Sequence, residues 1–157
     1  MDNITNEKEK QLNIEKLLNE GKTLVINPIG YSMVPLFIPP NDQAVVTPDF
    51  DKIKRLDVMV YRRPGGPLVI HRVYKVTKEG IYMVGDRQVE IEGPLPYECM
   101  LGKMVSFVRK GHTYSTKNVF YKAYSVIWMW LRPMRNLFAK AAKGVLKFTK
   151  TFSKTFK

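Results

Sequence analysis

Residues 57–84 decide the fold, and they read DVMVYRRPGGPLVIHRVYKVTKEGIYMV. Three runs rich in Val, Ile and Tyr (57–61, 68–76 and 81–84) are separated by the turn sequences Pro64-Gly65-Gly66 and Lys78-Glu79-Gly80. β-Branched and aromatic residues favour strands, and short connections that contain glycine favour hairpins. The stretch therefore predicts three consecutive strands of an antiparallel sheet.

Similar short runs lie on either side of this stretch, at residues 23–27, 44–47 and 103–109. Many short strands with close turns predict a mostly β fold, either a small bent antiparallel sheet or a partial barrel. Residues 28–41 interrupt the pattern with Gly30 and several prolines, so this stretch is either a loop or a site.

Helical patterns occur at both ends of the chain. Residues 6–19 predict a short N-terminal helix that Gly21 terminates. Beyond residue 117, lysines and apolar residues recur every three or four positions on different faces, which predicts C-terminal amphipathic helices interrupted at Pro133. The predicted organisation is an N-terminal helical segment (1–22), a β domain (23–117) and a basic aromatic helical tail (118–157).

Composition is that of an ordinary globular chain, with 45% hydrophobic and 25% charged residues. The net charge of +12 is unevenly distributed, because all 14 acidic residues lie at or before Glu98 whereas residues 99–157 hold 13 Lys or Arg. The single cysteine, Cys99, has no internal disulfide partner. No second thiol lies nearby for a structural zinc site, and we expect neither a metal nor an organic cofactor.

The basic tail predicts an anionic partner, either a membrane surface or a nucleic acid. We favour the membrane for residues 118–157, because Trp128 and Trp130 suit the lipid interface and phosphate binding does not need an apolar face. Residues 1–22 contain no secretory signal, and no window is long and apolar enough to span a bilayer. These features predict peripheral association with the cytoplasmic face and no nucleic-acid partner. The alternative is that the tail packs on the β domain and its lysines are simply solvated.

Two residues have the chemistry for acyl transfer, Ser32 and His71. Ser32 lies in the string Gly30-Tyr31-Ser32-Met33-Val34-Pro35, while His71 sits inside an apolar strand. The other histidine, His112, belongs to an apparent hairpin turn and is interpreted as solvated. A serine hydroxyl is a poor nucleophile at neutral pH without an adjacent base, and imidazole, whose unperturbed pKa is about 6.5, can serve as that base. Ser32 is thus the candidate nucleophile and His71 the candidate general base.

A third group is expected to orient the imidazole. Acidic candidates cluster in Gly85-Asp86-Arg87-Gln88-Val89-Glu90-Ile91-Glu92, one hairpin beyond the histidine. Serine, then histidine on a strand, then an acid is a coherent order for a triad. Asp86, Glu90 and Glu92 all remain candidates for the orienting acid.

Together these residues resemble the signal peptidase / LexA-type serine peptidase superfamily. Residues 30–35, then Val69-Ile70-His71-Arg72-Val73, then Gly85-Asp86 present three motifs in the family's order within residues 22–110. A histidine base is similar to the archaeal and endoplasmic-reticulum branch, because most bacterial signal peptidases and LexA-type regulators have lysine there. The resemblance implies that Ser32 attacks with His71 as its base. It also favours Glu92, or Glu90, over Asp86 as the supporting acid.

The serine loop departs from the signal-peptidase pattern at Gly30, where that branch often has a hydroxyl residue that helps to bind the oxyanion. We therefore expect the main-chain N–H of Ser32 to carry more of this role, with Gly30, Ser32 and Met33 as the oxyanion and substrate-binding loop. The resemblance predicts a serine endopeptidase that removes a signal or leader segment from an exported or processed peptide. A LexA-like regulatory autopeptidase and a non-catalytic binding module with the same fold are the alternatives.

Overall fold

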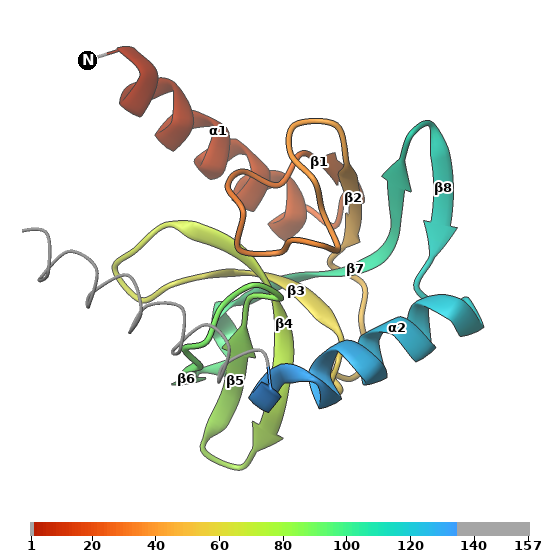
Figure 1. Ribbon diagram of the computed structural model, residues 1–157. Coiled ribbons are helices and arrows are strands. Elements are labelled where there is room, and N and C mark those ends of the chain that lie inside the picture. The colour runs from red at the N-terminus through yellow and green to blue at the C-terminus, as the bar shows by residue number, and fades with distance from the viewer. Residues whose placement is uncertain (1, 135–157) are drawn as a thin grey trace, which may run out of the picture.

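The computed structural model describes residues 2–134 and shows a mostly β molecule with one helix near each end of this range (Figure 1). All strand pairs are antiparallel, in the order β1-β2-β7-β3-β4-β5-β6, and β8 pairs with β7. The strands are β1 (Leu24–Ile26), β2 (Gln43–Thr47), β3 (Val58–Arg62), β4 (Leu68–Thr77), β5 (Gly80–Val84), β6 (Glu92–Leu95), β7 (Met100–Arg109) and β8 (His112–Ser115). The predicted mostly β fold with a bent antiparallel sheet is confirmed, and the sheet is open.

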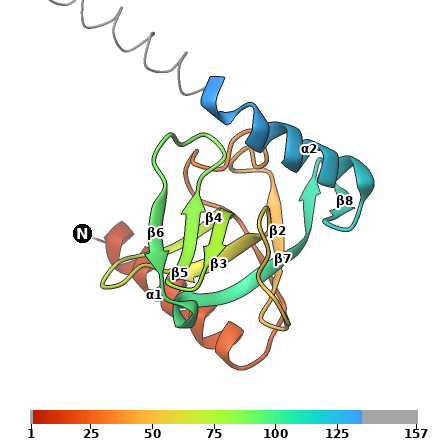
Figure 2. The ribbon, with the colours of Figure 1, turned by 90° about the horizontal axis from the view of Figure 1, so that it is seen from below.

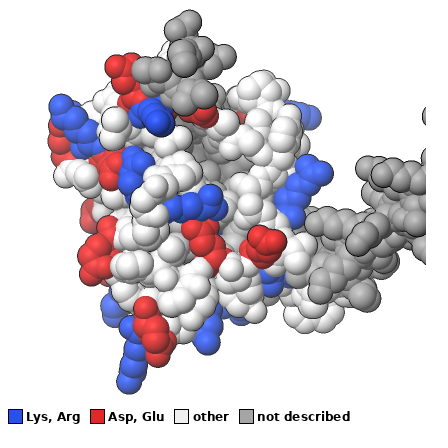
Figure 3. Space-filling view, turned by 90° about the vertical axis from the view of Figure 1, so that its left-hand side faces the viewer, with Lys and Arg blue, Asp and Glu red and all other residues white. Residues whose placement is uncertain are grey.

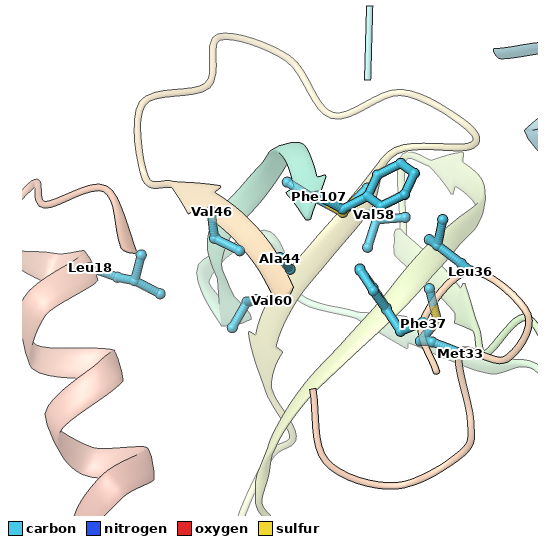
Figure 4. Packing of buried hydrophobic residues seen from close by; sticks show 10 residues of the cluster. Leu18, Met33, Leu36, Phe37, Ala44, Val46, Val58, Val60 and Phe107 are labelled. Atoms are coloured by element: carbon cyan, nitrogen blue, oxygen red, sulfur yellow. The ribbon is translucent and has the colours of Figure 1, made fainter. Parts of the chain in front are cut away.

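Strand β3 lies at the centre of the sheet and divides the hydrophobic interior into two clusters. Val58 and Val60 face one cluster, while Met59 and Tyr61 face the other. Successive side chains of a strand point to opposite faces, so a strand that is buried on both faces supplies two cores. Figure 4 shows the first cluster, to which Leu18 of the N-terminal helix also contributes.

Helix α1 (Asp2–Asn19) ends where the sequence predicts. Gly21 has φ 82°, and the N–H of Lys22 donates to the carbonyl of Leu17 at 3.0 Å. A left-handed glycine with such a bond closes the last helical turn. The short helix η1 (Tyr97–Cys99) then links β6 to β7.

Helix α2 (Val119–Trp130) begins at Asn118, whose side chain accepts a hydrogen bond from the N–H of Phe120 at 2.8 Å. This is the capping interaction that Asn favours at a helix start. The helix ends before Pro133, as predicted. The expected lysine-rich helix from Lys140 to Lys157 lies outside the described residues.

Two strands were not predicted, β6 and β8. The segment of β6 contains Gly93 and Pro94, and that of β8 is polar, so neither resembles a strand in sequence. Lys110 and Gly111 join β7 to β8 with φ values of 50° and 77°, the positive angles that a two-residue hairpin loop needs. His112 is exposed beside this turn, in agreement with its interpretation as a solvated residue.

Seen from below, α2 runs beside the loop that joins β5 to β6 (Figure 2). Trp128 Nε1 donates to the carbonyl of Asp86 in that loop at 3.0 Å, and Arg132 donates to the carbonyl of Val89. Within residues 2–134 no helix is long and apolar enough to cross a membrane.

Candidate active site

Ser32 lies in the loop between β1 and β2, which the hydrophobic core holds in place. Met33, Leu36 and Phe37, just beyond the serine, are each at most 3% exposed and belong to the first core cluster (Figure 4). The N–H of Phe37 donates to the carbonyl of Met33 at 3.1 Å, which closes a turn. The loop is therefore anchored immediately after the candidate nucleophile.

A buried carboxylate and an arginine hold the same loop from its other side. Arg109 donates to the carbonyls of Pro35 and Leu36, at 2.8 and 2.7 Å, and pairs with Asp42 at 2.7 Å. Asp42 also accepts from the N–H of Ile38 at 2.8 Å. A loop that lacks strand or helix hydrogen bonds thus has its backbone groups satisfied by side chains.

The turn that follows β5 touches the serine directly. The N–H of Arg87 donates to the carbonyl of Ser32 at 2.8 Å. A Cβ atom at Gly85 would lie 2.7 Å from that same carbonyl oxygen, closer than real Cβ contacts allow. Gly85 of the Gly85-Asp86 motif is therefore required by the close approach of the serine loop.

His71 is buried, at 2% exposure, in the middle of β4. Its Nδ1 atom lies 3.0 Å from the hydroxyl of Tyr61, and that hydroxyl donates to Glu92 Oε2 at 2.8 Å. Arg63 binds both oxygens of the same carboxylate, with both distances at 2.8 Å. The imidazole is thus connected to a carboxylate through a phenol.

The hydrogen-bond pattern fixes the tautomer of His71. The Tyr61 hydroxyl has one hydrogen, and it goes to the carboxylate of Glu92, which as an anion only accepts. The hydroxyl oxygen must then accept from His71, so Nδ1 carries the hydrogen and Nε2 carries the lone pair. Nε2 has no hydrogen-bond partner among the described residues.

The surroundings hold the base neutral and the acid charged. Burial, aided by the positive charge of Arg63, lowers the pKa of His71 to about 4. Burial also opposes the charge on Glu92, but the hydrogen bonds from Arg63 and Tyr61 outweigh it and lower the pKa of that carboxyl group. Burial and the neighbouring Glu92 raise the pKa of the Tyr61 phenol. At neutral pH the site therefore contains a neutral imidazole, whose unprotonated nitrogen has a lone pair.

The structure separates the three acidic candidates. Glu92 reaches His71 through Tyr61, whereas Glu90 is exposed. Asp86 is 3% exposed and forms a two-pronged ion pair with Arg72 at 2.7 and 2.8 Å. Its carboxylate also accepts from the hydroxyl of Tyr124 on α2 at 3.0 Å. The hydrogen bonds of Asp86 thus link β4, the turn after β5 and α2.

Ser32 borders an apolar groove of about 250 Å³. The groove runs between α1, the segment that follows β1, and the start of β4, and its walls include Val69 and Ile70, which directly precede His71. The other lining residues are Glu7, Gln11, Ile14, Ile26, Asn27, Pro28, Ile29, Val60 and Leu68. The structure therefore places the serine beside the strand that carries the histidine, in a groove suited to apolar side chains.

One edge of β4 is open along this groove. The N–H and carbonyl of Val73 bond to Asp57 and Leu56 on the β3 side, so by alternation those of Ile70 face away from β3. Pairing with β5 stops at Arg72, opposite Val84, and no described residue bonds to the backbone of Ile70 on that side. The strand can therefore accept another extended chain.

Sequence reasoning missed Tyr61 and Arg63. Tyr61 stands diagonally across the β3–β4 ladder from His71, because His71 pairs with Met59 and Tyr61 is two residues farther along the same face. The two strands and their turn were recognisable, so the register of this hairpin was the signal that could have identified the phenol.

Among residues 2–134, no group of His, Cys, Asp and Glu is arranged to hold a metal ion. Comparison with models of protein families found none that matches this chain, and no curated protein proved similar to it. The family resemblance of the three motifs therefore stays a prediction.

Proposed function

We propose that this protein is a serine endopeptidase in which Ser32 is the nucleophile and His71 the general base. The observation that carries the proposal is the tautomer of His71. Its Nδ1–H is committed to Tyr61, so Nε2 presents a lone pair, as base catalysis requires. The Ser32 carbonyl is bonded to the turn at Arg87, whose neighbour Asp86 pairs with Arg72, the residue after His71.

In the proposed acylation step, Ser32 Oγ attacks the carbonyl carbon of the scissile peptide bond while its proton passes to His71 Nε2. The carbonyl oxygen becomes an oxyanion. In the described part of the chain, the N–H groups of Ser32 and Met33 have no hydrogen-bond acceptor, so both are available to donate to it. The intermediate then collapses, the C–N bond breaks, and the proton on Nε2 moves to the leaving amine.

Deacylation repeats these roles with water. His71 Nε2 accepts a proton from a water molecule whose oxygen attacks the ester carbonyl on Ser32. The ester bond then breaks, and the proton returns to the serine oxygen. Tyr61 holds the imidazole in one tautomer throughout, and Glu92 holds the phenol. The complete reaction consumes only the peptide and one water molecule, and it regenerates the free serine and the neutral imidazole.

The groove supports an extended peptide with apolar side chains as the substrate. The free N–H and carbonyl of Ile70 would pair with the main chain of the peptide, while the apolar walls would receive alternate side chains. Signal and leader segments have this apolar, unfolded character near the cleavage site. We therefore propose a signal or leader segment of an exported or processed peptide as the substrate class.

A fluorophosphonate probe tests the nucleophile without knowledge of the substrate. We expect covalent labelling of the peptide that contains Ser32, detected by mass spectrometry. Labelling should be lost in Ser32→Ala and His71→Ala but retained in Ser115→Ala, a matched change on the exposed strand β8. Circular dichroism checks that each variant folds. Folded wild-type protein that resists the probe would contradict the peptidase and favour the binding module, whereas spontaneous cleavage of its own chain would favour the regulatory autopeptidase.

A further inference from the structure

The outward face of α2 is a continuous apolar stripe. Phe120 is 85% exposed and Trp130 is 74% exposed, and the other members lie at helical spacing between and beyond them. The exposed apolar residues of this stripe are Val119, Phe120, Val126, Ile127, Trp130 and Met134. The opposite face of α2 packs on the protein through residues such as Tyr124 and Met129, so the stripe is not needed to hold the helix in place.

A basic groove of about 520 Å³ borders one edge of the stripe, and Val126 belongs to both features. Its charged lining residues comprise five basic side chains and one acidic one: Lys54, Arg55, Lys103, Lys117, Lys122 and Asp57. Asp57 pairs with Lys103 at 2.8 Å. Within the described part of the chain, the other four cations have no hydrogen bond or ion pair to their side-chain nitrogens. The groove thus carries uncompensated positive charge.

We infer that this surface docks on a membrane, with the α2 stripe in the lipid interface and the head group of an anionic phospholipid in the basic groove. Trp and Phe suit the boundary between head groups and acyl chains, and cations beside them attract anionic lipids. α2 and the whole sequence after Glu98 contain no acidic residue that would repel such a surface. The face drawn in Figure 3, by contrast, has acidic and basic side chains interspersed.

The pairing of the two features favours a lipid over other partners. A nucleic acid would use the cations but would leave the apolar stripe exposed to water, at a cost in free energy. A second copy of this protein would bury the stripe but would bring two positively charged grooves together, which is unfavourable. A bilayer with anionic lipid satisfies both the apolar and the basic surface at once.

Vesicle co-sedimentation of the full-length protein tests this inference, with phosphatidylcholine vesicles that contain or lack 30% phosphatidylserine. A basic residue near such a surface contributes roughly a fivefold gain in binding. Lys117→Gln/Lys122→Gln should therefore weaken partitioning to the anionic vesicles by roughly 25-fold and leave the zwitterionic vesicles unaffected. Phe120→Ser/Trp130→Ser should weaken binding to both kinds of vesicle by at least about tenfold.

Matched controls change the same residue types elsewhere on the surface. Lys75→Gln/Lys78→Gln removes two exposed lysines of the β4–β5 hairpin, and Leu12→Ser removes an exposed apolar side chain of α1. Both should bind vesicles nearly as well as the wild type. If Lys75→Gln/Lys78→Gln weakened binding to the anionic vesicles as much as Lys117→Gln/Lys122→Gln, the proposed role of the groove would be wrong. Such a result would show that only the total charge of the protein matters.

Two further results would overturn the inference. The first is binding to duplex DNA with a steep salt dependence but no binding to vesicles. The second is a dimer, detected by analytical ultracentrifugation, that Phe120→Ser/Trp130→Ser dissociates. All changed residues are exposed, and thermal denaturation should confirm that every variant folds like the wild type.

Discussion

At the residue scale, Tyr61 separates the imidazole of His71 from the carboxylate of Glu92. A carboxylate in direct contact would both orient the imidazole and stabilise its positive charge. The phenol orients the ring, but the charge of Glu92 is already compensated by Arg63. Burial, aided by the charge of Arg63, therefore keeps the pKa of His71 low although an anion lies only two hydrogen bonds away.

The first prediction concerns the phenol. Tyr61→Phe keeps the buried ring but removes the acceptor of Nδ1–H, so the imidazole can adopt either tautomer. We expect kcat/KM on a leader-peptide substrate to fall roughly tenfold, the value of about one hydrogen bond. Glu92→Gln in the Tyr61→Phe background should add little, because Glu92 acts through Tyr61. Fully additive losses would show that Glu92 acts by another route.

The second prediction follows from the low pKa of His71, which is lowered to about 4. A general base works unprotonated, so activity is lost as the pH falls through this pKa and is constant above it. We expect kcat/KM to change little from pH 5.5 to 8 and to be halved near pH 4, with folding checked by circular dichroism at each pH. A midpoint near 6.5 would show that burial does not control this group.

Two residues of the candidate site, Ser32 and His71, could be proposed from the sequence, because they lie in local strings with recognisable chemistry. The orienting group could not be identified in this way. The choice among Asp86, Glu90 and Glu92 depended on the register of β3 and β4, which places Tyr61 diagonally across from His71, and on the hydrogen bond from Tyr61 to Glu92. Arg72 accounts for one of the three acids, because its buried guanidinium requires a buried anion and Asp86 supplies it.

At the scale of elements, the turn after β5 is shared by three parts of the molecule. Ser32, Arg72 and α2 each bond to residues 85–87. The strands were predictable from their β-branched residues, and the errors fell on β6 and β8, where pairing rather than composition creates the strand. No local pattern indicates that α2 would lie against this turn.

The third prediction tests the close contact between the serine loop and Gly85 in the turn after β5. Gly85→Ala would place a methyl group 2.7 Å from the Ser32 carbonyl and must displace the loop. A misplacement of about 1 Å in an active site costs on the order of 100-fold in rate, so we expect a loss of that size in kcat/KM. Gly21→Asn, at an open position with positive φ at the end of α1, is the matched control and should be fully active. An active Gly85→Ala protein would mean that the turn does not position Ser32.

The fourth prediction assigns Asp86 to stability. Asp86→Asn leaves the buried guanidinium of Arg72 without its anion, so the free energy of unfolding should fall by about 3–5 kcal/mol. Glu90→Gln, at an exposed position of the same loop, should change it by less than about 0.5 kcal/mol. Urea denaturation measures both. A variant at Asp86 that is as stable as the wild type would show that other groups compensate Arg72.

At the scale of the whole molecule, a single open sheet encloses two hydrophobic clusters that meet at β3. The serine loop packs into one cluster, and Tyr61, the hydrogen-bond partner of His71, packs into the other. Alternating hydrophobicity predicts a sheet, but the bending of that sheet depends on bulges such as the one between Val45 and Val46. No pattern in the sequence predicts where these bulges occur.

The open edge of β4 also bears on the risk of aggregation. An unpaired strand edge is a template for pairing with any other chain, including a second copy of the same sheet. Helix α1 lies along this edge, and Gln11 accepts from the N–H of Leu68 at 2.9 Å, so part of the edge is already occupied. A backbone group that is already bonded in this way cannot pair with a strand of another sheet. The same segment that forms a wall of the groove thereby protects the protein against edge-to-edge aggregation.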